Sequence, residues 1–228
     1  MSMSMRFERP PLVIEHPWDH LQTFFTLGGS RKYDSWITSG ESAPNRIVRG
    51  DVYAMNRSMR ARCPHKYWQS LYDDNDDIPE LAVIDPGWNL FTMSDVQWKK
   101  QNVLRLLDAL FTTVIRKGIN IPRATKILHI KRPALIPVCD AYVLRLLGIP
   151  GTSANSGLAA VIQIRTAGRA NLKTLEELQQ RLKTEPPKLS RTLVRITDAL
   201  VWGSHPDSWL GRRAAAEAAA DDEDKPGE

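Results

Sequence analysis

The sequence predicts a mainly α-helical protein that folds as a single multi-helix globular domain. Apolar residues recur at spacings of three, four and seven between Asp95 and Lys117, as on the buried face of a helix. Capping residues, glycines and prolines divide most of the remaining chain into segments of helical length. No run of residues alternates convincingly between apolar and polar, as a half-buried strand would. With 228 residues, of which 42% are hydrophobic, the chain can bury a sizeable core.

The N-terminal part of the chain divides at its prolines and glycines. Residues 1–17 are predicted to be an irregular lead-in, because three prolines interrupt them. The helical domain is expected to span residues 18–210, with a first helix over Trp18–Leu27. Asp51 is a suitable N-cap for the next helix, and Pro64 is expected to end that helix and begin another.

The centre of the domain is predicted from its strongest helical pattern. This helix runs from about Asp95 to Lys117 and ends at Gly118, which suits a left-handed C-terminal cap. Its apolar stripe is wide, so we expect it to be the central helix of the core. A second helix is predicted from Pro122 to about Ile130, and a third from Asp140 to Gly148.

Three more helices are predicted in the C-terminal part. One runs from about Gly157 to Ala167, one is capped by Asn171 or Thr174, and one is capped by Ser190. Residues 211–228 are low in complexity and acidic at their end. We expect this segment to be a frayed helix that continues into a disordered tail.

Composition limits the classes of protein to which the chain can belong. The formal net charge is +5 and the pI is about 9.3, which favours a polyanionic partner without requiring one. Cys63 and Cys139 form neither a disulfide framework nor a zinc motif, so we expect reduced thiols and no metal or other cofactor. No apolar run resembles a signal peptide or a membrane span, which predicts a soluble cytoplasmic protein without a membrane partner.

A first basic cluster begins within the loop predicted at residues 38–50 and continues past it. It consists of Arg46, Arg49, Arg57, Arg60, Arg62 and Lys66, and a single acid offsets it. Arg57 and Arg60 lie about one helical turn apart and can present two guanidinium groups to neighbouring phosphates. Tyr67 and Trp68 lie next to these basic residues in the sequence, and their aromatic rings can stack on a base. Alternatively, these arginines form an ordinary solvated face that pairs with the acidic loop at 73–85.

A second basic cluster contains Arg123, Lys126, His129, Lys131 and Arg132, without an acid among them. Arg123, Lys126 and Arg132 are further candidates for contacts with nucleic acid. Arg123, Lys126 and His129 follow one another at spacings of three. His129 is a candidate for proton transfer, although a lone histidine is more often a packing residue.

Asp140 is the sharpest candidate for a catalytic residue. It follows an apolar segment and precedes the helix that ends at Gly148. A carboxylate in this position would be partly buried and held by backbone N–H groups, and therefore ionised and well oriented. Simple helix capping is the alternative, and the two roles are compatible.

These segments carry a resemblance to an uncharacterised family. The chain resembles a bacterial, mostly actinobacterial family that is known only as a domain of unknown function. The resemblance is carried by the segment RATKILHIKRPALIPVCDAYVLRLLG, with NRSMRAR before it and WGSHPDSWL after it. The resemblance covers about residues 15–210. It implies no activity.

A narrower resemblance links residues 120–148 to the helix-hairpin-helix DNA glycosylases. The layout is similar to the helix–crossing–helix core of that superfamily, in which an apolar crossing ends in Pro-Val-Asp. In this chain Pro137, Val138, Cys139 and Asp140 fill that place, with Cys139 as an extra residue. The resemblance implies that Asp140 matches the aspartate that stabilises positive charge on the sugar while a flipped base leaves.

The chain departs from the glycosylase pattern at its hairpin. The glycine-rich turn that holds a DNA phosphate in that superfamily is replaced by residues 117–122, which contain one glycine. Arg123 stands where the bifunctional members have a lysine nucleophile, or that lysine is displaced to Lys126. An arginine does not form a Schiff base at neutral pH. No set of cysteines for an iron–sulfur cluster is present.

Three functions are compatible with these features. The first is nucleic-acid binding by a helical domain with a degenerate DNA-glycosylase-like core that uses Asp140. The second is a non-enzymatic module that binds or regulates protein partners. The third is a small-molecule enzyme in which Asp140 and His129 form an acid–base pair.

Overall fold

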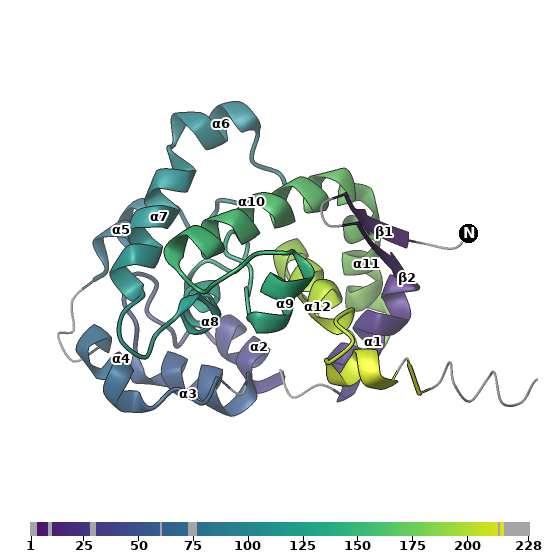
Figure 1. Cartoon of the computed structure of the whole chain (residues 1–228), viewed down its shortest axis with the longest axis horizontal. Helices are drawn as coiled ribbons and strands as arrows, with labels where there is room; N and C mark the ends of the chain where they lie inside the picture. The colour runs from purple at the N-terminus through teal and green to yellow at the C-terminus, as the bar shows by residue number, and fades with distance from the viewer. Residues whose placement is uncertain are drawn as a thin grey trace, which may run out of the picture.

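The computed structural model is mainly α-helical, as the sequence predicts, with one two-stranded sheet in its described part (Figure 1). It describes residues 4–8, 11–27, 31–59, 61–72, 77–213 and 215–216. The elements are β1 (Ser4–Phe7), β2 (Leu12–Glu15), α1 (Pro17–Leu27), α2 (Arg31–Thr38), α3 (Arg49–Ser58), α4 (His65–Tyr72), α5 (Pro79–Val83), α6 (Asp95–Lys100), α7 (Val103–Val114), α8 (Ile121–Lys131), α9 (Ala141–Leu146), α10 (Ala154–Ala170), α11 (Leu172–Thr184) and α12 (Leu193–Gly203).

The predicted irregular lead-in is wrong, because β1 and β2 form an antiparallel hairpin in which Ser4 pairs with Glu15 and Phe7 with Leu12. Met5 and Phe7 of β1 are buried while Ser4 and Arg6 are exposed, which is the two-residue period of a strand. The hairpin is anchored to the helical domain by Asn171. Its side chain accepts a hydrogen bond from the backbone N–H of Arg6 (3.2 Å) and donates one to the carbonyl of the same residue (2.8 Å).

The single helix predicted over Asp95–Lys117 is also wrong, since it is divided into α6 and α7. The break falls at Asn102, whose φ of 50° lies in the left-handed region that asparagine tolerates better than most residues. The buried stripe lies on α7, whereas Val96 of α6 is 75% exposed. The apolar period therefore identifies the core helix correctly but overestimates its length.

Helices α7, α8, α10 and α12 pack together and contribute much of the core. The α10 helix lies across α7 and α8 (Figure 1), and Gly157 allows its close approach, because a Cβ atom there would lie 2.4 Å from Ile121 Cδ1. α1 and α11 pack against α12, while α2 and α3 pack against α8. α8 is consequently buried along most of its length.

Helix starts are predicted with mixed success. Asp140 caps α9, as expected, and Asn171 occupies the N-cap position of α11. The prediction that Asp51 is an N-cap is wrong: α3 begins at Arg49, and the Asp51 carboxylate reaches back to the N–H of Val48 (2.8 Å). α12 is capped by Thr192 rather than Ser190.

The predicted tail, 211–228, lies mostly outside the described residues; its first three residues are helical. No helix within the described ranges is both long and apolar enough to cross a membrane. Cys63 and Cys139 are buried free thiols, as predicted.

Candidate functional site

Asp140 lies at the start of α9, where the apolar crossing from α8 ends. Its Oδ1 atom accepts hydrogen bonds from the backbone N–H groups of Tyr142 (3.0 Å) and Val143 (3.2 Å). The side chain is partly exposed, whereas Val138 and Cys139 before it are buried. Both of these hydrogen bonds use Oδ1 of the carboxylate. Asp140 therefore caps its helix and remains accessible.

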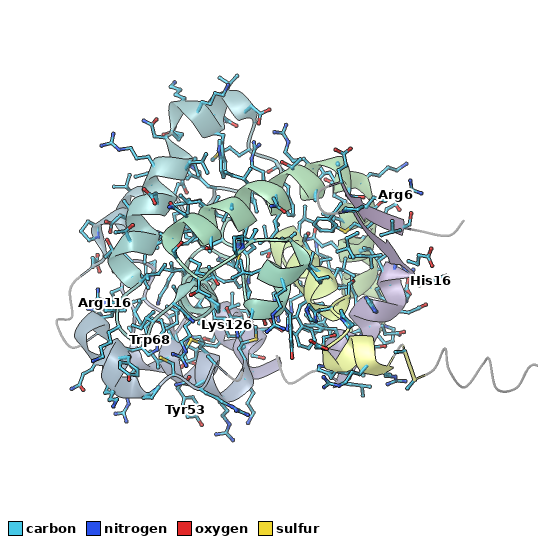
Figure 2. All side chains as sticks on the ribbon, viewed as in Figure 1. Arg6, His16, Tyr53, Trp68, Arg116 and Lys126 are labelled. Carbon is cyan, nitrogen blue, oxygen red and sulfur yellow. The ribbon has the colours of Figure 1, made fainter. Side chains whose placement is uncertain are left out.

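Lys126 is the cationic neighbour of Asp140. It projects from α8 and is only 8% exposed, and its Nζ donates to the carbonyl of Met59 at the end of α3 (3.3 Å). Burial lowers the pKa of Lys126, and the Asp140 charge acts in the opposite direction. Figure 2 shows Lys126 between α8 and α3. The Asp140 carboxylate therefore acts electrostatically on a buried amine that α8 holds against the end of α3.

Arg123 lies one turn before Lys126 but binds the protein itself. Its guanidinium donates to the carbonyls of Ala61 (3.2 Å), Gly118 (2.7 Å) and Arg62 (3.3 Å). These three bonds join the start of α8 to the segment after α3 and to the turn before α8. Arg123 thus positions the basic segment, and its donors are not directed to a phosphate.

His129 and Arg132 lie in the core. His129 is fully buried, and its Nδ1 forms a 2.6 Å hydrogen bond with the carbonyl of Ile136. Burial lowers the pKa of His129 to about 4, so the ring is neutral at pH 7. Arg132 is 1% exposed and donates to the carbonyls of Ile84 (2.8 Å) and Pro44 (2.8 Å). The structure does not bring either side chain to the surface with Asp140.

A buried ion pair fixes α3 against α8, and no sequence pattern indicated it. Lys131 Nζ pairs with Asp51, and neither side chain has exposed area. The Asp51 carboxylate also accepts from Trp36 Nε1 (2.8 Å) and Ser42 Oγ (2.8 Å). The one acid among the residues of the first basic cluster is therefore neutralised inside the protein.

The crossing that presents Asp140 rests on a second buried network, in α12 and α2. Arg195 donates to Asp34 (Nε to Oδ1, 2.9 Å) and to Asp198 (Nη1 to Oδ1, 2.6 Å). The other oxygen of Asp198 accepts from the backbone N–H of Val138, 3.1 Å away. Burial raises the pKa of Asp198 to about 7, against the opposing effect of Arg195. An arginine and an aspartate three residues apart in a largely apolar helix could have indicated this network.

A family model described as a family of unknown function, DUF6308, matches residues 18–205. The chain belongs to this family. Neither the curated proteins nor the solved structures contained a match. The region matched to DUF6308 includes α3, α8, α9 and α12, and therefore the whole candidate site, but not the N-terminal hairpin.

The exposed face of this DUF6308 protein beside Lys126 is basic and aromatic. Arg49, Arg57, Arg62 and Lys66 are exposed on and between α3 and α4. Tyr53 is 52% exposed, and the Arg57 guanidinium carbon lies 5.6 Å from the centre of its ring. Lys66 Nζ similarly lies 5.2 Å from the centre of the Tyr67 ring. Arg60, predicted to act with Arg57, lies outside the described residues.

Proposed function

We propose that the protein binds nucleic acid on the basic face formed by α3 and α4. The observation that carries the proposal is the exposed pair of Arg57 and Tyr53, on a helix whose acid is buried in an ion pair with Lys131. An exposed ring beside a guanidinium can stack on a base while the cation neutralises a phosphate. The net charge of +5 supports the same class of partner.

Arg57→Ala should weaken binding to every nucleic-acid sequence by a similar factor, because a phosphate contact carries no base information. We expect the slope of log K against log salt to fall by about one. Fluorescence anisotropy with labelled single- and double-stranded DNA and RNA across a salt gradient measures both quantities.

Arg105→Ala is the matched control, since it removes the same charge from an exposed position on α7. It should leave affinity and salt slope close to those of the wild type. Equal losses of affinity in Arg57→Ala and Arg105→Ala would show that binding depends on the net charge of the protein and not on the face formed by α3 and α4. A chain that ignores nucleic acid at low salt and captures a protein would instead support the non-enzymatic interaction module.

A second proposed function, cleavage of the bond between a base and its sugar, rests on the partly exposed Asp140 carboxylate at the start of α9. The α9 N–H groups hold Oδ1 of Asp140, and the other oxygen can stabilise positive charge that develops on a sugar. The resemblance of residues 120–148 to the DNA glycosylases supports this chemistry. Lys126 contributes a nearby amine whose pKa burial lowers.

Asp140→Asn should strongly slow base release while the protein remains folded, because asparagine caps helices as well as aspartate does. We expect the single-turnover rate to fall by about 10²–10³-fold. The assay is release of bases from oligonucleotides that contain damaged or mismatched nucleotides, with an abasic-site analogue as a binding probe. Base release that survives in Asp140→Asn would remove this residue from the reaction.

A further inference from the structure

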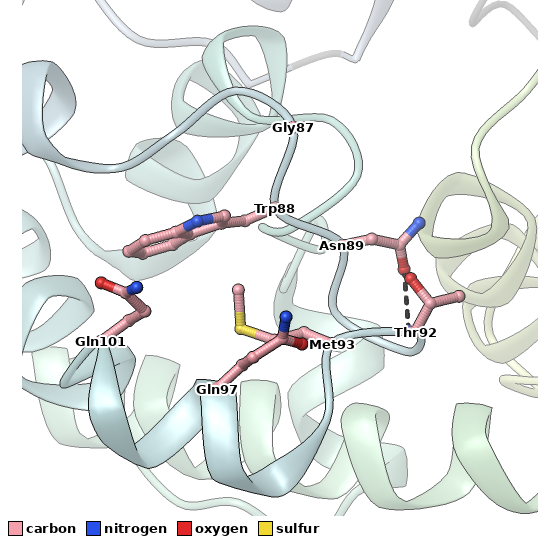
Figure 3. A pocket seen from close by; sticks show the side chains of 7 residues that line it. All are labelled: Gly87, Trp88, Asn89, Thr92, Met93, Gln97 and Gln101. Atoms are coloured by element: carbon pink, nitrogen blue, oxygen red, sulfur yellow. Dashed lines mark hydrogen bonds between the residues drawn. The ribbon is translucent and has the colours of Figure 1, made fainter.

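A pocket of about 210 Å³ lies between the loop that precedes α6 and α6 itself. Figure 3 shows its main lining side chains, which are Trp88, Asn89, Thr92, Met93, Gln97 and Gln101. None of the described residues that line it carries a charge. The volume is below the range of typical drug-sized pockets and suits a small ring system.

The pocket walls are held in place before any ligand arrives. Leu90 in the middle of the loop is fully buried, and its N–H donates to the carbonyl of Ala134 (2.9 Å). Arg165 of α10 donates to the carbonyl of Met93 (2.8 Å). The Trp88 indole forms one wall, and Met93 extends toward it from the opposite side (Figure 3). A flat aromatic face opposite a polarisable thioether suits a planar ligand.

The amide groups of the pocket are oriented by bonds that engage their oxygen atoms. Asn89 Oδ1 accepts from the N–H groups of Phe91 (3.0 Å) and Thr92 (3.2 Å). Gln97 Oε1 accepts from both the N–H and the hydroxyl of Ser94 (3.2 Å each), in the capping box of α6. A backbone N–H can only donate, so the oxygen atoms must face these partners. Gln97 Nε2 is therefore the amide atom left to bind a ligand, and it is a donor, whereas the Asn89 amide points away from Trp88 and Met93 (Figure 3).

We propose that this pocket binds an uncharged planar heteroaromatic ring that carries carbonyl or ring-nitrogen acceptors, which is the chemistry of a nucleobase. Trp88 stacks on the ring, while Gln97 donates a hydrogen bond to its edge. Gln101, exposed at the start of the segment between α6 and α7, can donate or accept at the rim. A charged ring would find no opposite charge among the lining residues.

The pocket is separate from the proposed nucleic-acid face. In Figure 1, α6 lies at the top of the molecule and α3 and α4 lie at the bottom. The base can come from a free nucleoside or from an unstacked position in a single strand, and both present the same ring. A chain that binds nucleosides but not DNA would support the pocket and contradict the function proposed for α3 and α4.

Gln97→Glu tests the pocket without disturbing its fold. The carboxylate keeps the two bonds to Ser94, and an acidic side chain in the first turn favours the helix. It replaces the Nε2 donor by a charged acceptor, which repels the acceptors of the ligand. Isothermal titration of the full chain with adenosine and with uridine should show binding that Gln97→Glu weakens about tenfold or more.

Gln180→Glu is the matched control, since it adds the same charge at an exposed position of α11; it should not change nucleoside affinity. Titration with a short single-stranded oligonucleotide tests whether the base comes from a free nucleoside or from a single strand. Binding of the nucleoside or of the oligonucleotide supports the pocket if Gln97→Glu weakens it. Ribose and glucose should not bind. The proposal is overturned if Gln97→Glu affects neither titration, or if glucose binds as well as the nucleosides do.

Discussion

Arg195→Met should be among the most destabilising substitutions in this protein, with an expected loss of about 3–5 kcal/mol of unfolding free energy. Arg195 is 3% exposed and bridges two buried carboxylates, Asp34 and Asp198. Methionine fills much of the same space but leaves both acids without that partner in an apolar region. Urea denaturation of the two proteins at pH 8 measures the difference.

The loss should be smaller at pH 5 than at pH 8. Burial already raises the pKa of Asp198 to about 7, and removing Arg195 takes away an effect that lowers it. A carboxyl group whose pKa is higher in the folded than in the unfolded state stabilises the fold at low pH. That contribution disappears as the pH rises toward the folded-state pKa. The variant should therefore recover part of its stability in acid.

Arg145→Met is the control for the loss of an arginine ion pair. Arg145 lies 3.7 Å from Asp207, and both side chains are more than 60% exposed (61% and 65%). Its removal should cost less than about 1 kcal/mol. A loss in Arg195→Met as small as this would mean that the carboxylates find other partners. The double variant Arg195→Met/Asp198→Asn should be more stable than Arg195→Met alone.

Local patterns in the sequence predict much of the helical architecture and the cap at Asp140. The α7 stripe and the Asp140 cap depend on residues within one or two turns of one another, and spacing alone expresses such relations. The hairpin is different, because each strand has four residues and its burial depends on the helical domain beneath it. The break at Asn102 could not be predicted either, because neither a proline nor a glycine lies next to it in the sequence.

The roles of the basic residues could not be predicted, because their partners are distant in the sequence. Arg123 binds carbonyls about 60 residues away, and Arg132 binds segments that precede it by 48 or more. On a helix wheel such residues look like a solvated polar stripe. An arginine has five donors and a long apolar stem, so it can satisfy loop carbonyls inside a fold as well as phosphates outside it. Lys126 and Arg57 share the same sequence signal, yet one is buried and the other exposed.

Lys131→Met should destabilise the protein by about 3 kcal/mol, and most strongly where α3 is attached. The lysine also donates to Ser42 Oγ (2.7 Å) and to the carbonyl of Ala43 (2.9 Å), so its loss releases the loop before α3 as well as Asp51. Denaturant unfolding measures the total. Hydrogen exchange should show lower protection for α3 amides, with smaller changes in α10.

The exposed residue Lys99 provides the comparison, since Lys99→Met should change stability by no more than about 0.5 kcal/mol. Asp51→Asn/Lys131→Met should be more stable than Lys131→Met, because the amide oxygen still accepts from Trp36 and Ser42 without a buried charge. If the double variant is no more stable, the loss comes from packing rather than from the uncompensated carboxylate. In the wild-type protein, the ion pair with Lys131 keeps the Asp51 carboxylate away from the face that carries Arg57 and Tyr53. The internal charge balance of α3 and its positive outer surface therefore depend on one buried lysine.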